Sequence, residues 1–474
     1  MTFRRITLIA VAMLLLLALI VTAVISRIDT RTYRDTFEQA VAERFNATLD
    51  IGGPLTLHWF PAPRASAENL SLMQGDTEVA SADKVDVRLS WATLWRGEPV
   101  LHSVTLTSPS LHLVRDAEGN LNLQRTSAGP DNGRGISLAS LRVDNGTLSL
   151  TQQTQGAPRR FEAGALTLDL RDIRLPAGNA PLPQRLALQG QLRAQTLDIQ
   201  GASATDVAFD IDAEHGLITL ANLRTRLFDG AGEGALTADY AGDTPVFDLR
   251  FALQDFSLQQ FLRQISPEQQ ASGQLDFTAA LHTRGRSLDD WLAHLGGDAT
   301  LRGDQLVLEG MDIDEELSRY QSTQRFNLVD LGALAFAGPV GIAATKGAGF
   351  ARLFDRSRGS STLTALISDW QIRDGIAHAR DAAMATEKNR LVMLGEVDLG
   401  QRRFSDTRVA VVDRRGCAIM MQGISGPFSS PRVESVSYVK ALLGAPLALL
   451  RQGLSLVEMD EACEPVYQGS IASP

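Results

Sequence analysis

The chain has 474 residues, of which 44% are hydrophobic and 21% are charged, and its 55 acidic and 45 basic residues give a formal net charge of −10. This balance is typical of an ordered chain, because disordered segments combine low hydrophobicity with high charge. An acidic chain is also a poor nucleic-acid binder, since the phosphate backbone is bound by a basic face. The length predicts two or three domains, or one elongated domain.

The first predicted element is a transmembrane helix at residues 6–25. The run Ile6–Ile25 carries no charge, and at ~1.5 Å per residue a helix of this length spans the ~30 Å hydrocarbon layer. A cleaved signal peptide usually has an apolar core of about 7–15 residues and a small-residue cleavage site, which Val24–Arg27 do not provide. We therefore expect residues 1–5 to be a short tail and residues 6–25 an uncleaved anchor. Arginines flank both ends of the span, so charge counting alone leaves its orientation open.

After the anchor the pattern changes from helical to extended. Apolar residues at spacings of three and four predict a helix over residues 29–45. From residue 55 apolar and polar residues alternate, as at Leu55, Leu57 and Trp59, which predicts strands with one buried face. We therefore assign residues 26–125 to an N-terminal β domain. Residues 126–135 lack apolar periodicity and are the best candidate for a linker.

The alternation resumes after the linker and predicts a central sheet over residues 136–265. Apolar residues skip by two at Val207, Phe209 and Ile211, and again between Phe247 and Leu253. The sequence Asp144–Gly146 (DNG) is a hairpin signal. Because most connections are short, we expect neighbouring strands to run antiparallel.

The last region, residues 266–474, combines strands with helices. Short helices are predicted at 256–265, 287–295 and 311–320, the second capped by Ser287. A longer helix is predicted at 437–457. No motif in the sequence predicts catalysis, a cofactor or a metal: the P-loop, GxSxG, HExxH and CxxC patterns are absent. The acidic residues 312–316 lack the glycine and the spacing of a calcium loop and favour a helix N-terminus. We expect a protein without enzymatic activity.

The two cysteines, Cys417 and Cys463, bear on the compartment. Without a CxxC motif or a histidine at ligand spacing they do not form a zinc site. In an oxidising compartment they would pair and close a long loop, worth ~4 kcal/mol in the chain-entropy model; otherwise they are two unrelated buried thiols. A membrane-anchored, periplasmic body with a disulfide between Cys417 and Cys463 fits both the anchor and the cysteines.

The apolar face of the predicted sheet has to be covered, at ~25 cal/mol per Å² removed from water. The predicted helices are too few to cover it. Two alternatives remain: a sandwich with a dry core, or a curved sheet whose groove holds an apolar ligand, and periodicity does not distinguish them. The candidate groove residues are Leu188, Leu192, Val207, Phe209, Ile211, Leu236, Phe247, Leu249, Phe251 and Leu253.

Several short motifs follow one another in a fixed order. They are Leu55–Pro63 (LTLHWFPAP), Ala80–Val87 (ASADKVDV), Leu89–Gly97 (LSWATLWRG), Ser108–Leu113 (SPSLHL), Arg115–Asn122 (RDAEGNLN), Leu227–Gly230 (LFDG), Cys417, Gly426–Phe428 (GPF), Pro431 and Cys463–Gly469 (CEPVYQG). Together with the anchor they make the chain similar to the AsmA family of periplasmic proteins anchored in the bacterial inner membrane.

The resemblance implies a mainly β fold: an N-terminal transmembrane helix, then an elongated, curved antiparallel β-sheet with a hydrophobic groove and a few short helices. It also implies a kinship with bridge-like lipid-transfer proteins and a role in outer-membrane biogenesis. Phospholipids would be the ligands and other envelope proteins further partners, with residues 1–5 in the cytoplasm and the body in the periplasm. The alternative is a non-enzymatic scaffold or regulator of outer-membrane protein assembly that docks through exposed strand edges.

Overall fold

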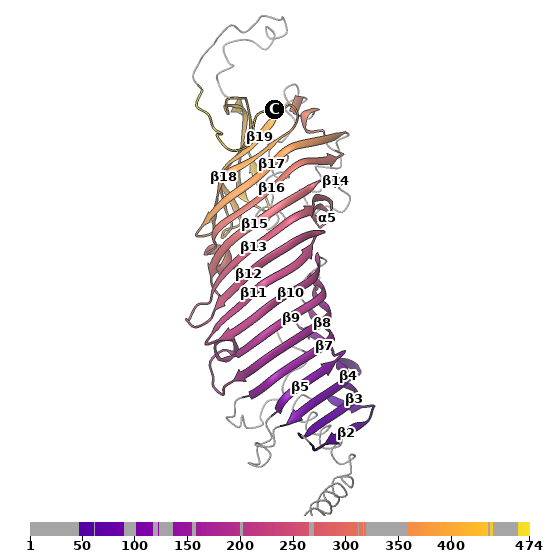
Figure 1. Ribbon diagram of the computed structural model, residues 1–474. Helices are drawn as coiled ribbons and strands as arrows, with labels where there is room; N and C mark the ends of the chain where they lie inside the picture. The colour runs from indigo at the N-terminus through magenta and orange to yellow at the C-terminus, as the bar shows by residue number, and fades with distance from the viewer. Residues whose placement is uncertain are drawn as a thin grey trace, which may run out of the picture. The chain divides into compact units, whose positions relative to one another are not determined.

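A computed structural model of the chain describes residues 47–60, 62–89, 101–116, 122, 136–153, 158–199, 202–264, 270–310, 312–315, 317–318, 359–434, 437–438 and 463–474 (Figure 1). The predicted anchor at 6–25, the helix at 29–45 and the linker at 126–135 lie outside the described residues. Within the described ranges, no helix has the length and apolar character needed to cross a membrane. The chain divides into unit 1, Met1–Asp169, and unit 2, Leu170–Pro474.

Unit 1 is a β-sheet. Its strands are β1 (Thr48–Ile51), β2 (Leu55–His58), β3 (Arg64–Gln74), β4 (Thr77–Leu89), β5 (Leu101–Thr107), β6 (Ser110–Arg115), β7 (Ile136–Gln152) and the first part of β8 (Arg159–Leu175). Strands β1 and β2 pair with successive parts of β3, which pairs with β4, and β4 pairs with β5 and β6, all antiparallel. The division between the units falls inside β8, beyond the predicted linker.

The expectation of an antiparallel sheet is wrong at one place in unit 1. Strands β5 and β6 both pair with β7 in parallel. A parallel pair requires a crossover of about a dozen residues or more, and the connection between Arg115 and Ile136 is long enough to provide it. The predicted linker, residues 126–135, lies between these two strands in the sequence.

The predicted hairpin at Asp144–Gly146 is also wrong, because these residues lie inside β7. Asn145 has a φ of 57° and forms a bulge where the partner of β7 changes from β5 to β6. The carbonyl of Asp144 accepts a hydrogen bond from the amide of Ser108 at 2.8 Å, and the amide of Thr147 donates to the carbonyl of Pro109 at 2.7 Å. Asn tolerates the left-handed region in a bulge as readily as in a turn, so the same residues suit both structures.

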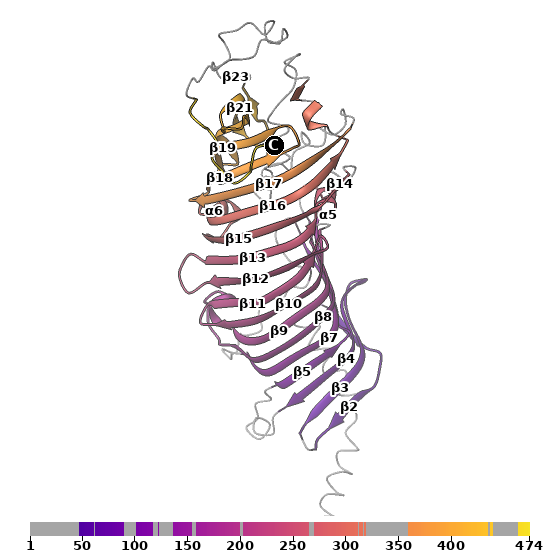
Figure 2. The same cartoon turned by 45° about the horizontal axis from the view of Figure 1, so that its top comes forward.

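Unit 2 contains an antiparallel sheet in which long strands pair with the next long strand along the chain (Figure 2). They are β9 (Ala187–Ile199), β10 (Ala202–Glu214), β11 (Leu217–Leu227), β12 (Gly230–Asp239), β13 (Val246–Ser257), β15 (Gln274–Arg284), β16 (Gly296–Glu309), β17 (Ser360–Arg373), β18 (Ile376–Ala385), β19 (Arg390–Asp398), β20 (Arg403–Val412) and β21 (Ala418–Pro427). The short strands β14 (Ala271–Ser272), β22 (Arg432–Val433) and β23 (Ser437–Tyr438) pair with β16, β21 and β21. The strands of unit 2 are visibly bowed in Figure 2, which confirms the expected mainly β, curved architecture for this unit.

The described helices are short, as expected. They are α4 (Leu182–Arg185), α5 (Leu258–Arg263) and α6 (Leu288–Ala293), and residues 313–315 and 317–318 are also helical. Ser287 caps α6 as predicted, in a capping box with Asp290. Helix α5 begins later than predicted, because Phe256 and Ser257 end β13 and the Ser257 side chain caps the helix at the amide of Gln260. The predicted helix at 437–457 is wrong at its start, where Ser437 and Tyr438 pair with β21; its other residues lie outside the described ranges.

The main core of unit 2 lies on one face of the sheet, which we call the inner face. Its buried residues come from β13 to β21, from α5 and from Ile313 and Leu317. A second, smaller core on the opposite face joins Val392 and Val412 of the sheet to Tyr467 and Ile471 of the C-terminal residues. Strands β18 to β20 thus carry consecutive buried residues, such as those at 382–385, which is typical of strands covered on both faces.

Candidate functional site

An apolar cavity of about 460 Å³ lies in unit 1. Its walls come from β1, β3, β4, β5, β6, β7 and β8, and every lining residue is aliphatic, glycine, proline, serine or threonine. The lining residues are Leu49, Leu70, Ser71, Leu72, Ala80, Ser81, Ala82, Leu106, Pro109, Ser110, Leu111, Val143, Gly146, Thr147, Leu148 and Leu166. The cavity is within the size range of small-ligand sites.

The strand register explains why these side chains meet. Leu72 lies opposite Leu49 on one side and Ala80 on the other, and Ala80 lies opposite Leu111. Leu111 in turn lies opposite Leu148 through the parallel pairing. Residues directly opposite one another share a face of the sheet, so the two-residue period of each strand collects the leucines on one side.

Small residues leave the space that the cavity occupies. Ala80 and Ala82 stand where larger aliphatic residues would fill it. Gly146 is needed for close packing, because a Cβ atom there would lie 2.9 Å from Val143 Cγ1 and 3.3 Å from Pro109 Cγ. A glycine at the edge of the cavity thus allows β7 to pack closely beside β5 and β6, with which it pairs in parallel.

The opposite face of unit 1 carries ion pairs. Arg64 binds Asp86 at 2.6 Å, and Lys84 lies 3.9 Å from both Glu68 and Asp86. Partial burial favours the neutral form of Asp86, but the hydrogen bonds from Arg64 and Ser66 and the nearby positive charges outweigh it, so the pKa of Asp86 lies below its ordinary value. The sheet is therefore amphipathic, with its charges away from the cavity.

The ten predicted groove residues of unit 2 share the inner face. Leu188 lies opposite Ala213 and Leu192 opposite Phe209, while Leu236 lies opposite Leu249. Seven of the ten are half-buried: Leu192, Phe209, Ile211, Leu236, Phe247, Leu249 and Phe251. Leu188, Val207 and Leu253 are buried. The structure thus brings these residues onto one surface, much of which stays partly accessible over β9 to β13.

Bulges keep the apolar residues on that face. In unit 2, Asp206, Asn222, Asp255 and Gln305 lie inside strands and have φ between 51° and 53°. Each bulge shifts the alternation by one residue, as in β13, where Leu253 and Phe256 both reach the inner face across Asp255. A prediction based on strict alternation does not find these shifts. A polar Asn, Asp or Gln between two apolar runs is the sequence signal that indicates them.

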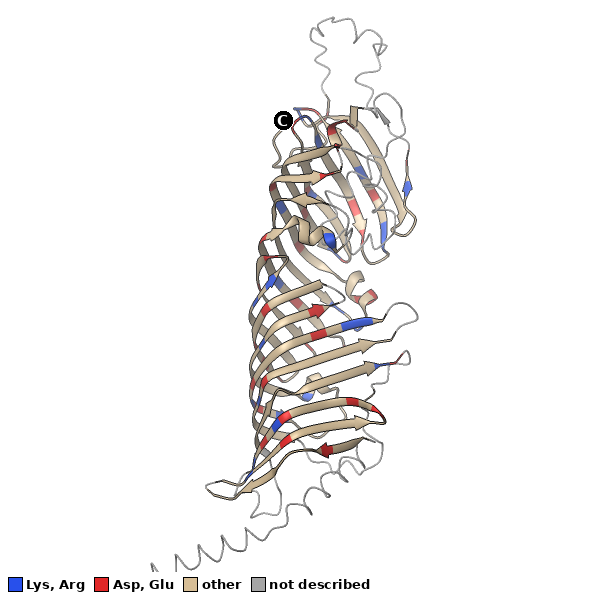
Figure 3. Cartoon of the chain, turned by 90° about the vertical axis from the view of Figure 1, so that its right-hand side faces the viewer, with Lys and Arg blue, Asp and Glu red and all other residues tan. Residues whose placement is uncertain are grey.

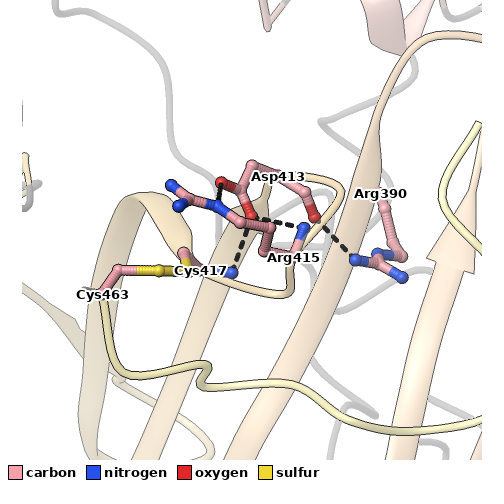
Figure 4. The surroundings of a disulfide bond; sticks show 5 residues. All are labelled: Arg390, Asp413, Arg415, Cys417 and Cys463. Atoms are coloured by element: carbon pink, nitrogen blue, oxygen red, sulfur yellow. Dashed lines mark hydrogen bonds and ion pairs between the residues drawn. A yellow bond between two sulfur atoms is a disulfide. The ribbon is translucent and has the colours of Figure 1, made fainter. Parts of the chain in front are cut away.

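The C-terminal residues pack on the face opposite the main core, and Figure 4 shows the disulfide that attaches them to Cys417. The predicted disulfide between Cys417 and Cys463 is confirmed, with Cα atoms 6.2 Å apart. Asp413 orders the turn before Cys417, because its carboxylate accepts hydrogen bonds from the amides of Arg415 and Cys417, both at 2.9 Å. The carbonyl of Asp413 accepts a hydrogen bond from Arg390 at 2.6 Å.

Tyr467 and Arg390 complete this attachment. The Tyr467 hydroxyl donates to Asp381 at 2.6 Å and accepts from the amide of Ile471 at 3.1 Å. Arg390 is buried, lies 5.2 Å from the centroid of the Tyr467 ring and donates to the carbonyl of Ile471 at 2.8 Å. Burial, together with the hydrogen bond to Asp381, raises the pKa of the Tyr467 phenol well above its ordinary value. Residues 463–474 thus form a fixed strap over β17 to β20.

Charged residues of both signs are scattered over the strands (Figure 3). In unit 2, Arg380 bridges Asp298 at 2.7 Å and Asp369 at 2.9 Å on the face opposite the main core. The hydrogen bond to Asp369 contributes most to a raised pKa of Arg380. Within the part of the chain that the structure describes, no group of three or more His, Cys, Asp or Glu residues is placed to hold a metal ion.

Sequence reasoning placed the candidate groove in unit 2 and missed the cavity in unit 1. A signal was available, because Leu106, Leu111 and Leu148 alternate with polar residues and Ala80 and Ala82 are small. It also missed the strap, since residues 463–474 have no regular secondary structure and therefore no periodicity.

Comparison with protein families gives a match over most of the chain. The model of the AsmA family matches residues 1–158 and 137–349. A comparison with curated proteins found no match. The family match includes the cavity of unit 1 and strands β9 to β16 and ends before β17, so the motifs at Cys417 and Cys463–Gly469 lie beyond the matched residues. Because the matched ranges cover more than half of its length, the chain belongs to the AsmA family.

Proposed function

We propose that the protein binds phospholipid acyl chains on the apolar faces of its sheets and assists lipid transport or lipid homeostasis in the bacterial envelope. The observation that carries this proposal is the cavity of unit 1, whose lining holds no ionisable side chain. A hydrocarbon chain needs no hydrogen-bond partner and gains ~0.8 kcal/mol for each CH₂ removed from water. The charged headgroup would stay outside, because the lining offers it no counter-charge.

The half-buried inner face of β9 to β13 supports the same proposal. Its leucine, isoleucine and phenylalanine side chains offer contact area without directional hydrogen bonds, which suits ligands that vary in length and unsaturation. Membership of the AsmA family is consistent with a lipid-related role in the envelope. The role is one of binding and release, without a chemical step, in the context of outer-membrane biogenesis.

The proposed location is the inner membrane, with the body in the periplasm. The uncharged run Ile6–Ile25 supports a single-pass anchor. The disulfide between Cys417 and Cys463 supports an oxidising compartment for the C-terminal residues. Placed in this way, the apolar faces would be within reach of lipids that leave the inner membrane.

Site-specific photo-crosslinking in cells tests lipid binding. A photoreactive phenylalanine analogue is placed at Leu111, which lines the cavity, and at Leu249, on the inner face of β13. The matched controls are the neighbouring exposed positions His112 and Arg250, on the opposite faces of the same strands. Adducts are identified by mass spectrometry of the labelled peptides.

We expect phospholipid adducts at Leu111 and Leu249 and background levels at His112 and Arg250. Equal lipid labelling at all four positions would contradict a specific apolar site. Protein adducts without lipid at Leu111 and Leu249 would instead favour the scaffold for outer-membrane protein assembly.

A further inference from the structure

Two aromatic clusters lie at opposite ends of β13. In the first, Phe228 of the β11–β12 turn, Phe256 of β13 and Phe261 of α5 contact one another, with ring centroids separated by 5.7 to 6.2 Å. In the second, Phe247 of β13 lies 5.9 Å from Tyr240 and 5.3 Å from Trp291 of α6, both edge-on. Edge-on pairs of this kind are worth about 0.5–1.5 kcal/mol beyond their buried area.

The pairing of β12 with β13 separates the clusters. Gly232, near the start of β12, lies opposite Leu253, and Asp239, at its end, lies opposite Val246. The first cluster is therefore at the margin where β11 turns into β12, and the second at the margin where β12 turns into β13. Helices α5 and α6 lie at opposite margins of the sheet, where its strands end (Figure 2).

The inner face of β13 continues between the clusters. Leu249, Phe251 and Leu253 alternate along the strand and point to the inner face with Phe247. The ring of Phe251 lies against β12, because a Cβ atom at Gly232 or at Gly234 would be 3.1 Å from it. Glycines in β12 thus let an aromatic ring lie flat on the inner face.

Burial changes at this strand. On the side of β9 to β12, Leu192, Phe209 and Leu236 of the inner face are half-buried. On the other side, Phe277 and Leu281 of β15 are half-buried but pack against the main core, in which Leu275 of β15 is 2% exposed and Leu301 of β16 is 4% exposed. The aromatic residues of β13 therefore stand at the border between an accessible apolar surface and a closed core.

The conformation of Phe228 indicates that its ring is needed there. Phe228 and Asp229 both have positive φ, 53° and 66°, as a two-residue hairpin turn of type I′ requires. Asn and Gly occupy such positions with little strain, whereas a bulky residue does so rarely. The strain at Phe228 is balanced by its contacts with Phe256 and Phe261 and by the hydrogen bond from the amide of Ser257 to its carbonyl at 2.8 Å.

We propose that these residues form an aromatic collar that ends the lipid path in unit 2. The collar consists of Phe228, Tyr240, Phe247, Phe251, Phe256, Phe261 and Trp291. Acyl chains run along the inner face of β9 to β12 and end in contact with the inner face of β13, and the core of β15 to β21 stays free of lipid. This inference rests on the proposed function, because the collar determines where a bound acyl chain ends.

The test maps how far an acyl chain reaches. The full-length protein is reconstituted into phosphatidylethanolamine vesicles that contain a phospholipid whose acyl chain ends in a diazirine. After illumination, labelled peptides are quantified by mass spectrometry. In the wild type we expect label near Phe209 and Leu236 and background levels at Leu301 and Leu366.

The variant Phe228→Asn removes the ring and keeps a residue that tolerates positive φ. We expect label at Leu301 and Leu366 to rise several-fold in this variant. Trp291→Ala opens the opposite margin at a residue that is 38% exposed, so this second variant spares the main core. Phe404→Leu is the matched control, because Phe404 belongs to a separate aromatic pair with Phe428, 5.0 Å away, and its replacement leaves the collar intact.

The possible results are distinct. Label at Leu301 equal to that at Phe209 in the wild type, or a pattern unchanged in both collar variants, would overturn the collar and leave the proposed function standing. The absence of label throughout residues 47–264 of the wild type would overturn the proposed function itself. A rise in the collar variants that is missing from Phe404→Leu supports the collar.

Discussion

Two regions of the inner face of unit 2 both carry apolar side chains, but these side chains are buried to different extents. On β10, Phe209 and Ile211 are half-buried, whereas on β19 Leu391 is fully buried. The difference lies in what covers each strand. Helix α5 contributes Leu258 and Leu262 to the core that contains Leu391, and Ile313 and Leu317 also belong to this core.

The outer faces of the two regions differ as well. On β10 the residues facing away from the apolar surface include the polar Asp210 and Asp212. On β18 to β20 they include Ala383, Val392 and Ala410, which are covered by Tyr467 and Ile471 of the strap. Continuous apolar runs therefore mark strands that are covered on both faces, whereas a two-residue period shows only that one face is polar.

Loss of the disulfide should have the largest effect on the difference between the closed region, β18 to β20, and the accessible region around β10. Cys463→Ala removes the cross-link that holds the strap and gives the unfolded chain back its loop entropy, at a cost of about 4 kcal/mol. We expect faster hydrogen exchange in β18 to β20 and an unchanged rate in β10, measured by mass spectrometry. Equal acceleration in β10 would show that the two regions unfold together. Phe60→Ser, at a side chain that is 89% exposed, is a control that should alter neither rate.

Substitution of one leucine in each region compares how completely the inner face is buried in the two regions. Leu391→Ala should lower the free energy of unfolding by about 2–5 kcal/mol, because Leu391 is completely buried. Leu236→Ala should cost about 1 kcal/mol, since the half-buried side chain loses less apolar contact. Urea denaturation gives both values. A cost at Leu236 as large as that at Leu391 would mean that the face of β12 is covered as fully as the core.

The strap should also show a pH dependence. The raised pKa of Tyr467 means that its neutral form stabilises the fold below the ordinary value of 10.0, and this stabilisation is lost as the pH rises through the higher pKa of the folded state. Tyr467→Phe removes the hydroxyl that donates to Asp381 and should cost about 1 kcal/mol at neutral pH. The variant should lose less stability than the wild type between pH 9 and pH 11. Parallel pH curves for the two proteins would contradict this role.

A further expected effect concerns a bulge between the two regions. Asp255 in β13 has a φ of 52°. Asp255→Val should cost about 1–2 kcal/mol, because a β-branched residue is strained in the left-handed region, whereas Asp255→Gly should be nearly neutral. Thermal unfolding distinguishes the two variants. Equal stability would show that the bulge relaxes, and the position of Phe256 at the border of the two regions would then not depend on it.

Much of the fold follows from short-range patterns. Alternation at Val207, Phe209 and Ile211 correctly predicted a one-faced strand, and Ser287 correctly predicted the start of α6. The motif at Asp144–Gly146 was misread, because Asn adopts positive φ both in hairpins and in bulges. The parallel step between β5 and β7 was missed for a related reason, since alternation carries no information about strand direction.

The pattern of polar and apolar residues thus determined strand positions, the shared inner face of the ten groove candidates and the pair of cysteines available for a disulfide. It left open whether the apolar face is accessible or closed. That outcome depends on contacts between residues far apart in the chain, such as Ile313 with the core of β17 and β19 and Tyr467 with Asp381. Periodicity reports only which side of a strand is apolar, and the covering elements come from segments whose own sequences do not say where they dock.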